Sequence, residues 1–320
     1  MRPPALRPAR PAPATTRRPA PRPPRASEET PSDGEVVKRG ALAASSVLYA
    51  GLRVLLVGGS GRTGRVVARR LVEEGVPTTV LARSGNARAV LPAEVSLITT
   101  SALTQPSTLA AALAGCNAVV WAAGVGSPAA VLNPLEAFWV VRQAGGEGVG
   151  GRLVQPGARR PRPPSPPFQE ADGVANMAAA ARDAGVRRFV LISSAGADDP
   201  LARLTFPGGV LAWKKRGELA LQRSGVPYTI LRPGGLTDKP LADGDGVVAF
   251  GPGAVGIPLP FGPKRELPGS IPRACVADLA VAALVAPAAA GRVVECVARA
   301  GAPRLAPPDL FAAAEQRRPE

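Results

Sequence analysis

The feature that most constrains this chain is a glycine-rich turn that joins an apolar run to a helical pattern. Residues Val54 to Gly64 read VLLVGGSGRTG, in which Gly58, Gly61 and Gly64 are spaced three residues apart. The first glycine allows a sharp turn, the second lets a phosphate approach the backbone, and the third lets the helix pack tightly. Amide groups at such a helix N-terminus favour phosphates. The turn therefore predicts a nucleotide site made of Gly58, Gly59, Ser60, Gly61, Arg62, Thr63 and Gly64.

A chain with 36 glycines can also produce this spacing by chance or as a plain tight turn. The surrounding sequence favours the nucleotide site. Val54 to Val57 is typical of a buried parallel strand, and Arg65 to Glu74 continues with helical spacing of apolar residues. Thr78 to Ala82 then reads as a second strand, so a β-α-β unit closes within about thirty residues, as the fingerprint requires.

The rest of the chain continues the alternation of strands and helices. This pattern predicts an α/β fold with a doubly wound parallel sheet. The further strands are expected at Val95–Ile98, Ala118–Ala122, Phe189–Ile192, Tyr228–Leu231 and Val293–Val297, and the further helices near Ser107–Leu113, Glu170–Ala184, Leu211–Arg223 and Ala277–Val285.

The net charge of +15 suggests nucleic acid, but its distribution argues against that class of partner. Most of the excess lies in residues 1–26, which contain arginine and no acidic residue, and in the Gly/Pro/Arg-rich residues 142–167. Basic residues interleaved with aromatic residues, as a stacking platform requires, do not occur. We therefore expect a small-molecule substrate or a partner protein, and no nucleic acid.

The chain contains no histidine and three widely spaced cysteines, Cys116, Cys275 and Cys296. The missing histidine excludes Ser-His-Asp and Cys-His catalysis and imidazole-bound metals. The cysteine spacing indicates neither a disulfide framework nor a zinc site, so we expect reduced, buried thiols. Acid-base chemistry would have to come from Lys, Tyr, Ser or carboxylates.

The composition divides the chain into three parts. Residues 1–50 are expected to be a disordered targeting peptide and linker, because the Pro- and Arg-rich start lacks acid and its prolines oppose the helix of a mitochondrial presequence. A plastid address is favoured, and a tail without targeting significance is the alternative. Residues 51–300 form the nucleotide-binding domain with a low-complexity insertion at 142–167, and residues 301–320 form a C-terminal tail.

We also expect no membrane insertion. The apolar stretch Ala41 to Leu52 is too short to span a bilayer before Arg53 interrupts it. The prediction is therefore a soluble protein of the plastid stroma.

Four motifs in order resemble one known family. They are VGGSGRTG at 57–64, DGVANMAAAARDAGVRRFVLISSAGA at 172–197, WKKRGELALQRSGVPYTILRPGGLTD at 213–238 and SIPRACVADLAVAAL at 270–284. Together they resemble the atypical short-chain dehydrogenase/reductase family, in its NAD(P)H-binding NmrA-like branch of plant and cyanobacterial plastid type. The resemblance covers about residues 52–299 without the insertion, and implies an NAD(P)-binding Rossmann fold.

In that family, the residue that ends the second strand helps to select the cofactor. An acid would bind the ribose 2′-OH of NAD, whereas Arg83 here, with Arg62 in the turn, suits the 2′-phosphate of NADP. NADP is therefore expected, with NAD possible, and the alternative is that both arginines are solvated. The family's Asp at the adenine edge is replaced by Ala102, which leaves backbone contacts around Leu103. Ala122, Ala123 and Gly124 match the small residues over which the cofactor lies, or simply allow tight packing.

The resemblance also implies catalytic positions, and one of them is empty. Relatives use a Ser after the fifth strand and a Tyr-x-x-x-Lys pair on the next helix. Ser193 and Ser194 match the first, with Ser194 as the catalytic candidate. The residues four before Lys214, Lys215 and Arg216 cannot exchange a proton, so the tyrosine is missing.

Two other segments of the resemblance concern the cofactor. Arg216 aligns with the family's lysine and could bind ribose or phosphate, although residues 214–216 could equally be a solvated helix face. Arg232, Pro233 and Gly234 match the turn whose backbone faces the nicotinamide, and a tight turn would explain this glycine as well. Cys275 stands where relatives often carry Asp.

Two functions follow. The first is an NADP(H)-binding protein that serves as a redox-sensing, scaffold or assembly factor of the plastid without Tyr-dependent catalysis. The second is an NADPH-dependent reductase of a small quinone, flavin or enone-like compound, in which solvent or Ser194 supplies the proton. Epimerase, isomerase or dehydratase chemistry is disfavoured by the missing tyrosine.

Overall fold

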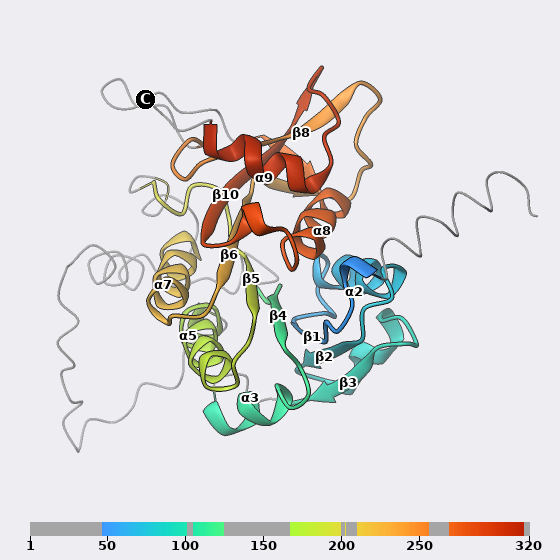
Figure 1. The fold of residues 1–320 in the computed structure, drawn as a ribbon, viewed down its shortest axis with the longest axis vertical. Helices are drawn as coiled ribbons and strands as arrows, with labels where there is room; N and C mark the ends of the chain where they lie inside the picture. The colour runs from blue at the N-terminus through green and yellow to red at the C-terminus, as the bar shows by residue number, and fades with distance from the viewer. Residues whose placement is uncertain are drawn as a thin grey trace, which may run out of the picture. The chain divides into compact units, whose positions relative to one another are not determined.

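A large, mainly parallel β-sheet forms the centre of the protein (Figure 1). The computed structural model describes residues 47–100, 105–124, 167–199, 202, 210–255 and 269–316. Within these residues the sheet has eight strands in the order β3-β2-β1-β4-β5-β6-β10-β8. The strands are β1 (Val54–Val57), β2 (Thr78–Ala82), β3 (Ser96–Thr99), β4 (Ala118–Trp121), β5 (Arg188–Ile192), β6 (Tyr228–Pro233), β8 (Asp245–Phe250) and β10 (Arg292–Ala300).

The strand order reverses at β1, and this is where a doubly wound sheet binds its ligand. Chain order runs outward from β1 through β2 to β3 on one side and from β4 through β5 to β6 on the other. All neighbours pair in parallel except β8, which is antiparallel to β10. The carboxyl ends of β1 and β4 therefore define the expected crevice.

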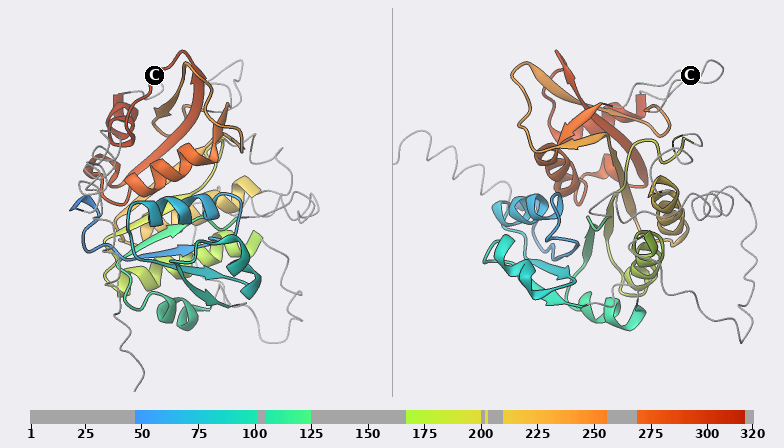
Figure 2. Two further views of the ribbon diagram at one scale, coloured as in Figure 1. Left: turned by 90° about the vertical axis from the view of Figure 1, so that its right-hand side faces the viewer. Right: turned by 180° about the vertical axis from the view of Figure 1, so that it is seen from behind.

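Helices cover both faces of the sheet. One face carries α2 (Gly64–Glu73) and α8 (Arg273–Ala282), which lie next to each other in the left view of Figure 2. The opposite face carries α3 (Pro106–Ala112), α5 (Pro167–Asp183) and α7 (Val210–Arg223). The elements that remain are the 3-10 segments η1 (Gly85–Val90) and η4 (Pro287–Ala289), helix α9 (Pro307–Gln316), and the two-stranded parallel sheet of β7 (Gly235–Thr237) and β9 (Ser270–Pro272).

The apolar strands require this layered arrangement, because alternate side chains point to opposite faces. Leu56 and Val80 belong to the core under α2 and α8, whereas Leu55 and Leu81 belong to the core under α5 and α7. All of β1 is fully buried. The predicted α/β fold with a doubly wound parallel sheet is confirmed.

The bounds of the predicted strands and helices agree with the observed bounds to within a few residues. Strands β7, β8 and β9 were not predicted, and α9 lies inside the expected C-terminal tail 301–320, where Leu310, Phe311 and Ala314 are buried. The insertion expected at 142–167 lies outside the described residues except for Pro167, the first residue of α5. Residues 1–46 of the expected targeting peptide and linker 1–50 also lie outside them, whereas residues 47–50 form a short helical turn.

No helix among the described residues is both long enough and apolar enough to cross a membrane.

Candidate cofactor and active site

The glycine turn between β1 and α2 has the geometry of a phosphate-binding loop. Gly58 has a φ of +81°, a backbone conformation that residues with a side chain rarely adopt. A Cβ on Gly64 would collide with the carbonyl oxygen of Gly58, and the amide of Gly61 donates to that same oxygen at 3.0 Å. Thr63 is the N-cap residue of α2 but makes no side-chain hydrogen bond to the helix. The first turn of α2 contains no acidic residue. The helix end is therefore suited to a phosphate group.

Small residues after β4 let two backbones meet at the switch point. A Cβ on Gly58 would lie 2.6 Å from the backbone nitrogen and the Cα of Ala123. Ala122 and Ala123 are partly buried and Gly124 is exposed. Their size is explained by this close packing, and their contact with a cofactor stays a prediction.

A small pocket next to this crossing contains two groups with reactive chemistry. Trp121 and Ala123 from the end of β4, together with Leu191, Ile192 and Ser193 from the end of β5, line one side. Val174 of α5 and Lys214 of α7 line the other. The pocket has a volume of only about 10 Å³, room for about one water molecule, and lies at the carboxyl ends of β4 and β5, the edge at which doubly wound sheets bind ligands.

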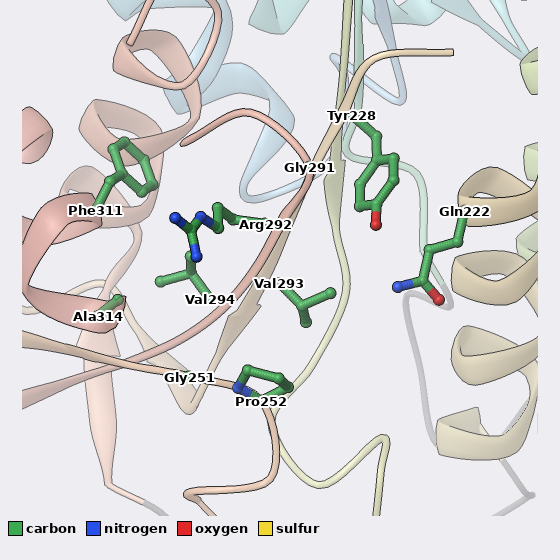
Figure 3. Close-up of a pocket in the computed structure, with 10 residues that line it drawn as sticks. All are labelled: Gln222, Tyr228, Gly251, Pro252, Gly291, Arg292, Val293, Val294, Phe311 and Ala314. Carbon is green, nitrogen blue, oxygen red and sulfur yellow. The ribbon is translucent and has the colours of Figure 1, made fainter. Parts of the chain in front are cut away.

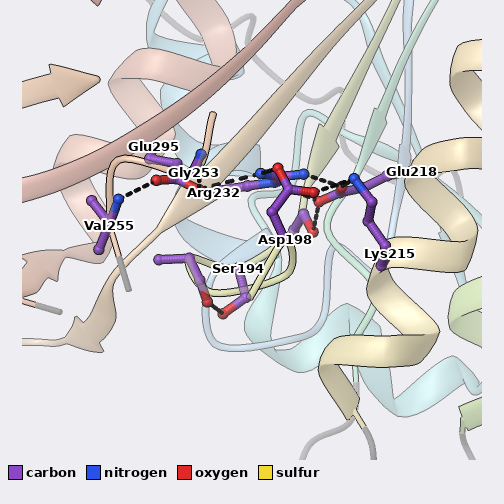
Figure 4. Close-up of polar contacts among 10 residues, drawn as sticks. Ser194, Asp198, Lys215, Glu218, Arg232, Gly253, Val255 and Glu295 are labelled. Atoms are coloured by element: carbon purple, nitrogen blue, oxygen red, sulfur yellow. Dashed lines mark hydrogen bonds and ion pairs between the residues drawn. The ribbon is translucent and has the colours of Figure 1, made fainter. Parts of the chain in front are cut away.

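The hydroxyl group of Ser193 is hydrogen-bonded to Glu218, which belongs to a buried ionic network around Arg232 (Figure 4). Ser193 donates to Oε1 of Glu218, and Arg232 donates to both oxygens of the same carboxylate, from Nε at 2.9 Å and from Nη2 at 2.6 Å. Glu218 and Arg232 are almost completely buried. Since an ionised carboxylate only accepts hydrogen bonds, the hydroxyl proton of Ser193 points away from the pocket.

The same arginine connects three further parts of the chain. Arg232 also donates to Asp198, in the loop after β5, and at 3.2 Å to Glu295 of β10. Lys215 pairs with Asp198 as well. Glu295 in turn accepts from the amides of Gly253 and Val255 at 3.2 and 2.6 Å. The network therefore ties the carboxyl ends of β5 and β6 to β10 and to the loop after β8.

Burial and hydrogen bonding compete in setting the pKa values of this network. Burial raises the pKa of Asp198, but the hydrogen bonds from Arg232 and Lys215 outweigh it, so the pKa falls to about 2. Burial raises the pKa of Glu295 despite the donors that surround it. The pKa of Arg232 is raised, because hydrogen bonds with Glu218 and Asp198 overcome the effect of its burial. Arg232 therefore stays charged.

The side chains predicted to select NADP do not converge. Arg62 donates to Asp238, which follows β7, rather than turning toward Arg83 at the end of β2. Arg83 is exposed and has no hydrogen-bond or ion-pair partner among the described residues. The expected two-arginine clamp is absent from this arrangement, and a 2′-phosphate contact by Arg83 stays a prediction.

The structure brings Lys214, and not Arg216, into the pocket with Ser193. Arg216 lies over the ring of Trp213, 5.7 Å from its centroid, and 3.9 Å from Asp172 of α5. Because the two cations are two residues apart on one helix, they face different directions. The sequence motif marked the helix correctly but could not indicate which cation turns inward.

The remaining candidate residues have clear local roles. Ser194 is partly buried and its Oγ bonds only the carbonyl of Ala195, at 3.3 Å, among the described residues. The side chain of Arg232 is committed to protein carboxylates, which leaves only the backbone of Arg232 and Pro233 for the expected cofactor contact. A Cβ on Gly234 would collide with the carbonyl of Gly269, so packing explains this glycine. Leu103 lies outside the described residues.

Neither tyrosine can replace the missing catalytic one. Tyr49 precedes β1, and its neighbours include Arg70 and Glu74 of the outer helix layer. Tyr228 begins β6, at the opposite end of the strands from Ser193. Neither of the two tyrosines therefore lies near Ser193 in the folded protein.

A larger cavity, of about 440 Å³, lies at the amino ends of β6 and β10, away from the glycine turn (Figure 3). Tyr228, Arg292 and Val293 line it together with Gln222 of α7 and Phe311 of α9. The smaller pocket, in contrast, lies at the carboxyl ends of the strands, where ligands bind in doubly wound sheets.

The cysteines do not form a reactive site. All three are free thiols, and burial raises their pKa values, for Cys296 to about 12. No group of His, Cys, Asp and Glu suited to a metal ion occurs among the described residues.

The fold and site define a nucleotide-binding oxidoreductase-like domain, and comparison with known proteins identifies its family. Residues 58–287 match the family described as NAD(P)H-binding. The chain belongs to this NAD(P)H-binding family.

Curated relatives agree with this assignment. The chain is 37% identical over 150 residues to an uncharacterized chloroplastic protein of Arabidopsis thaliana, covering 44% of this chain and 49% of that protein. It is 31% identical over 199 residues to sanguinarine reductase of Eschscholzia californica, covering 59% and 71%. It is 47% identical over 64 residues to the chloroplastic protein TIC 62 of Pisum sativum, but covers only 12% of it. These matches cover between 12% and 71% of the relatives' own lengths.

Solved structures share the fold. An oxidoreductase from Lactococcus lactis has a TM-score of 0.57 at 18% identity, over 83% of this chain and 98% of that one. A short-chain dehydrogenase/reductase from Veillonella parvula in complex with NADP has a TM-score of 0.51 at 14% identity, over 77% and 94%. These likenesses confirm the Rossmann-type architecture.

Proposed function

We propose that this protein is an NADPH-dependent reductase in which Lys214 supplies the proton that tyrosine supplies in other members of the superfamily. The observation that carries this proposal is the pocket in which Lys214 and Ser193 meet beside Ala123, at the carboxyl ends of β4 and β5. A bound nicotinamide cofactor supplies hydride. The protein must then protonate the acceptor atom, and an ammonium group that recovers its proton from water can do so.

The state of Ser193 supports the choice of Lys214 as donor. Because Ser193 donates a hydrogen bond to Glu218, its hydroxyl oxygen presents lone pairs to the pocket. It can therefore accept a hydrogen bond from Lys214 or from a ligand. Ser194 remains an alternative donor on the sequence evidence alone.

The substrate class follows from relatives and from the pocket walls. The chain covers 71% of sanguinarine reductase, a relative whose name indicates reduction of sanguinarine. Trp121, Leu191 and Val174 give the pocket beside Ser193 an apolar lining, which suits an apolar acceptor group once the pocket opens. We therefore favour a quinone, flavin or enone-like substrate.

NADP is the favoured cofactor. Arg83 ends β2 at the position that discriminates the two cofactors, and no acidic residue stands there to bind a ribose 2′-OH. Fluorescence titration with NADPH and NADH tests this preference, and binding of NADH as tightly as NADPH would contradict it.

Replacing Lys214 by Met tests the mechanism. The variant should lose turnover of NADPH with a quinone and flavin panel by about 100-fold or more, while NADPH affinity changes by only a few fold, since the loss concerns proton transfer. Arg216→Met is the matched control on the same helix and should stay active. If Arg216→Met loses turnover and Lys214→Met does not, the roles of the two cations are reversed.

A redox-sensing, scaffold or assembly role is the second candidate. It is favoured by the missing tyrosine and by the hydrogen bond that directs the hydroxyl proton of Ser193 to Glu218. Tight NADPH binding by the wild-type protein without turnover of any compound in the panel would favour this function over the reductase.

We further propose that the protein acts in the plastid stroma, directed there by residues 1–50. The chloroplastic relatives and the acid-free Arg/Pro-rich start support this location. A fluorescent protein fused behind residues 1–50 should enter plastids in plant cells, and retention in the cytosol would contradict the proposal.

A further inference from the structure

Asp238 bridges two arginines that lie far apart in the sequence. Arg62, in the glycine turn, donates to Oδ2 of Asp238. Arg273, the first residue of α8, donates from Nη1 to Oδ1 at 2.8 Å. Asp238 itself is exposed and follows β7, so it reaches both arginines from the segment that leads away from β6.

Arg273 is held in an unusual state for a buried cation. Its side chain is only 9% exposed, and its Nε has no hydrogen-bond partner among the described residues. A buried donor without an acceptor is costly, and such groups often mark the place of a ligand. The single carboxylate of Asp238 therefore satisfies this guanidinium only in part.

The surroundings of the two arginines favour an anion. Helices α2 and α8 pack against each other, and both begin without a side-chain cap or an acid in the first turn. The positive ends of two helix dipoles add to two guanidinium charges. Asp238 contributes only one negative charge against these positive charges. The cluster therefore keeps an excess of positive charge.

We propose that Arg62 and Arg273 bind the pyrophosphate of the cofactor and that Asp238 is an internal anion which the pyrophosphate displaces. This inference rests on the proposed NADP(H)-binding function. It adds Arg273 to the cofactor site and makes Asp238 a residue that weakens binding of the cofactor.

The position of the cluster selects the pyrophosphate over the 2′-phosphate. Asp238 and Arg273 belong to the segments after β6 and β9, whereas Arg83 follows β2. The strand order places β2 and β6 on opposite sides of β1. NADPH and NADH carry the same pyrophosphate, so Asp238 should affect both equally.

The size of the effect follows from the exposure of the pair. An exposed ion pair stabilises a protein only modestly, and a ligand that must break one loses a correspondingly small part of its affinity. Removing the competitor should therefore tighten binding by about two- to fivefold.

The decisive variant is Asp238→Asn. We expect the Kd of NADPH and of NADH, measured by fluorescence titration of the full chain in phosphate-free buffer, to fall two- to fivefold each, with an unchanged ratio. The gain should shrink at high salt, because salt screens exposed charges. Asp243→Asn is the matched control, since it changes the net charge equally at an exposed carboxylate 3.9 Å from Arg304, and should leave both affinities unchanged.

Arg273 is tested by two substitutions. Arg273→Gln should weaken both nucleotides by about tenfold, whereas Arg273→Lys, which keeps the charge, should recover part of the loss. Thermal unfolding of each variant separates a loss of affinity from a loss of fold.

Several outcomes would overturn the inference. Unchanged or weaker binding of both nucleotides by Asp238→Asn excludes displacement of Asp238. Tighter binding of NADPH alone would place the 2′-phosphate, and not the pyrophosphate, at this cluster. If the wild-type protein binds both nucleotides but the variants do not respond, only the inference fails; if it binds neither, the proposed function fails with it.

Discussion

At the scale of single residues, the glycine turn has little freedom to vary. Gly58 needs a positive φ and contact with Ala123, and Gly64 allows the first turn of α2 to touch the carbonyl of Gly58. Gly61 is less restricted, since a Cβ there would meet only that carbonyl oxygen, at 3.2 Å. The motif therefore combines two packing requirements with one exposed position, Gly61.

Gly64→Ala should destabilise the protein by about 1–3 kcal/mol, because the added methyl group collides with backbone that cannot move aside. Gly61→Ala should cost less in stability. Urea unfolding of both variants measures the difference, and equal free energies of unfolding would contradict the packing role of Gly64.

In contrast, the sequence could not predict the direction in which a side chain points. Arg62 was expected to join Arg83 at a 2′-phosphate, but it pairs with Asp238, which lies 176 residues further along the chain. Nothing in local spacing identifies such a partner. Lys214 and Arg216 could likewise not be separated until α7 was placed against α5 and β5.

At the scale of elements, the buried parallel strands were the most predictable. A continuous apolar run such as that of β1 admits few other interpretations when a glycine turn and a helix follow it. The short strands β7 and β9 carry no such pattern. The tail 301–320 was expected to be irregular, but α9 places Phe311 in the core.

Phe311→Ala tests how far α9 belongs to the domain. This side chain is 1% exposed, so its truncation should cost about 3–5 kcal/mol. Leu305→Ala, at a position 39% exposed just before α9, should cost much less. Thermal and urea unfolding compare the two, and a small loss for Phe311→Ala would indicate that α9 is dispensable.

At the scale of the whole molecule, the Arg232 network connects elements that local sequence cannot relate. It links the loop after β5, helix α7, strand β6 and strand β10 through side chains separated by as many as 63 positions. Breaking such a buried network by removing one partner is strongly destabilising, because charges are then left unpaired. We expect it to hold the site-bearing ends of the strands together.

The pH dependence of stability tests this network. The pKa of Asp198 in the folded protein, about 2, lies below its ordinary value of 3.8, so its contribution is present above pH 4 and is lost as the pH falls toward 2. Asp198→Asn should lower the free energy of unfolding by about 2 kcal/mol at pH 7, and by progressively less toward pH 3. Asp243→Asn serves as an exposed control. A loss for Asp198→Asn that is constant with pH would contradict the assignment.

The sequence by itself determined the class of fold, the glycine turn between the first strand and the first helix, and the exclusion of histidine chemistry. These properties depend on residue types and on spacings within about thirty positions, which local sterics and periodicity translate directly into structure. Only the tertiary structure decided that Lys214 shares a pocket with Ser193, that Ser193 donates a hydrogen bond to Glu218, and that Asp238 joins Arg62 to Arg273. Each of these depends on which distant side chains the packed sheet brings within hydrogen-bonding distance.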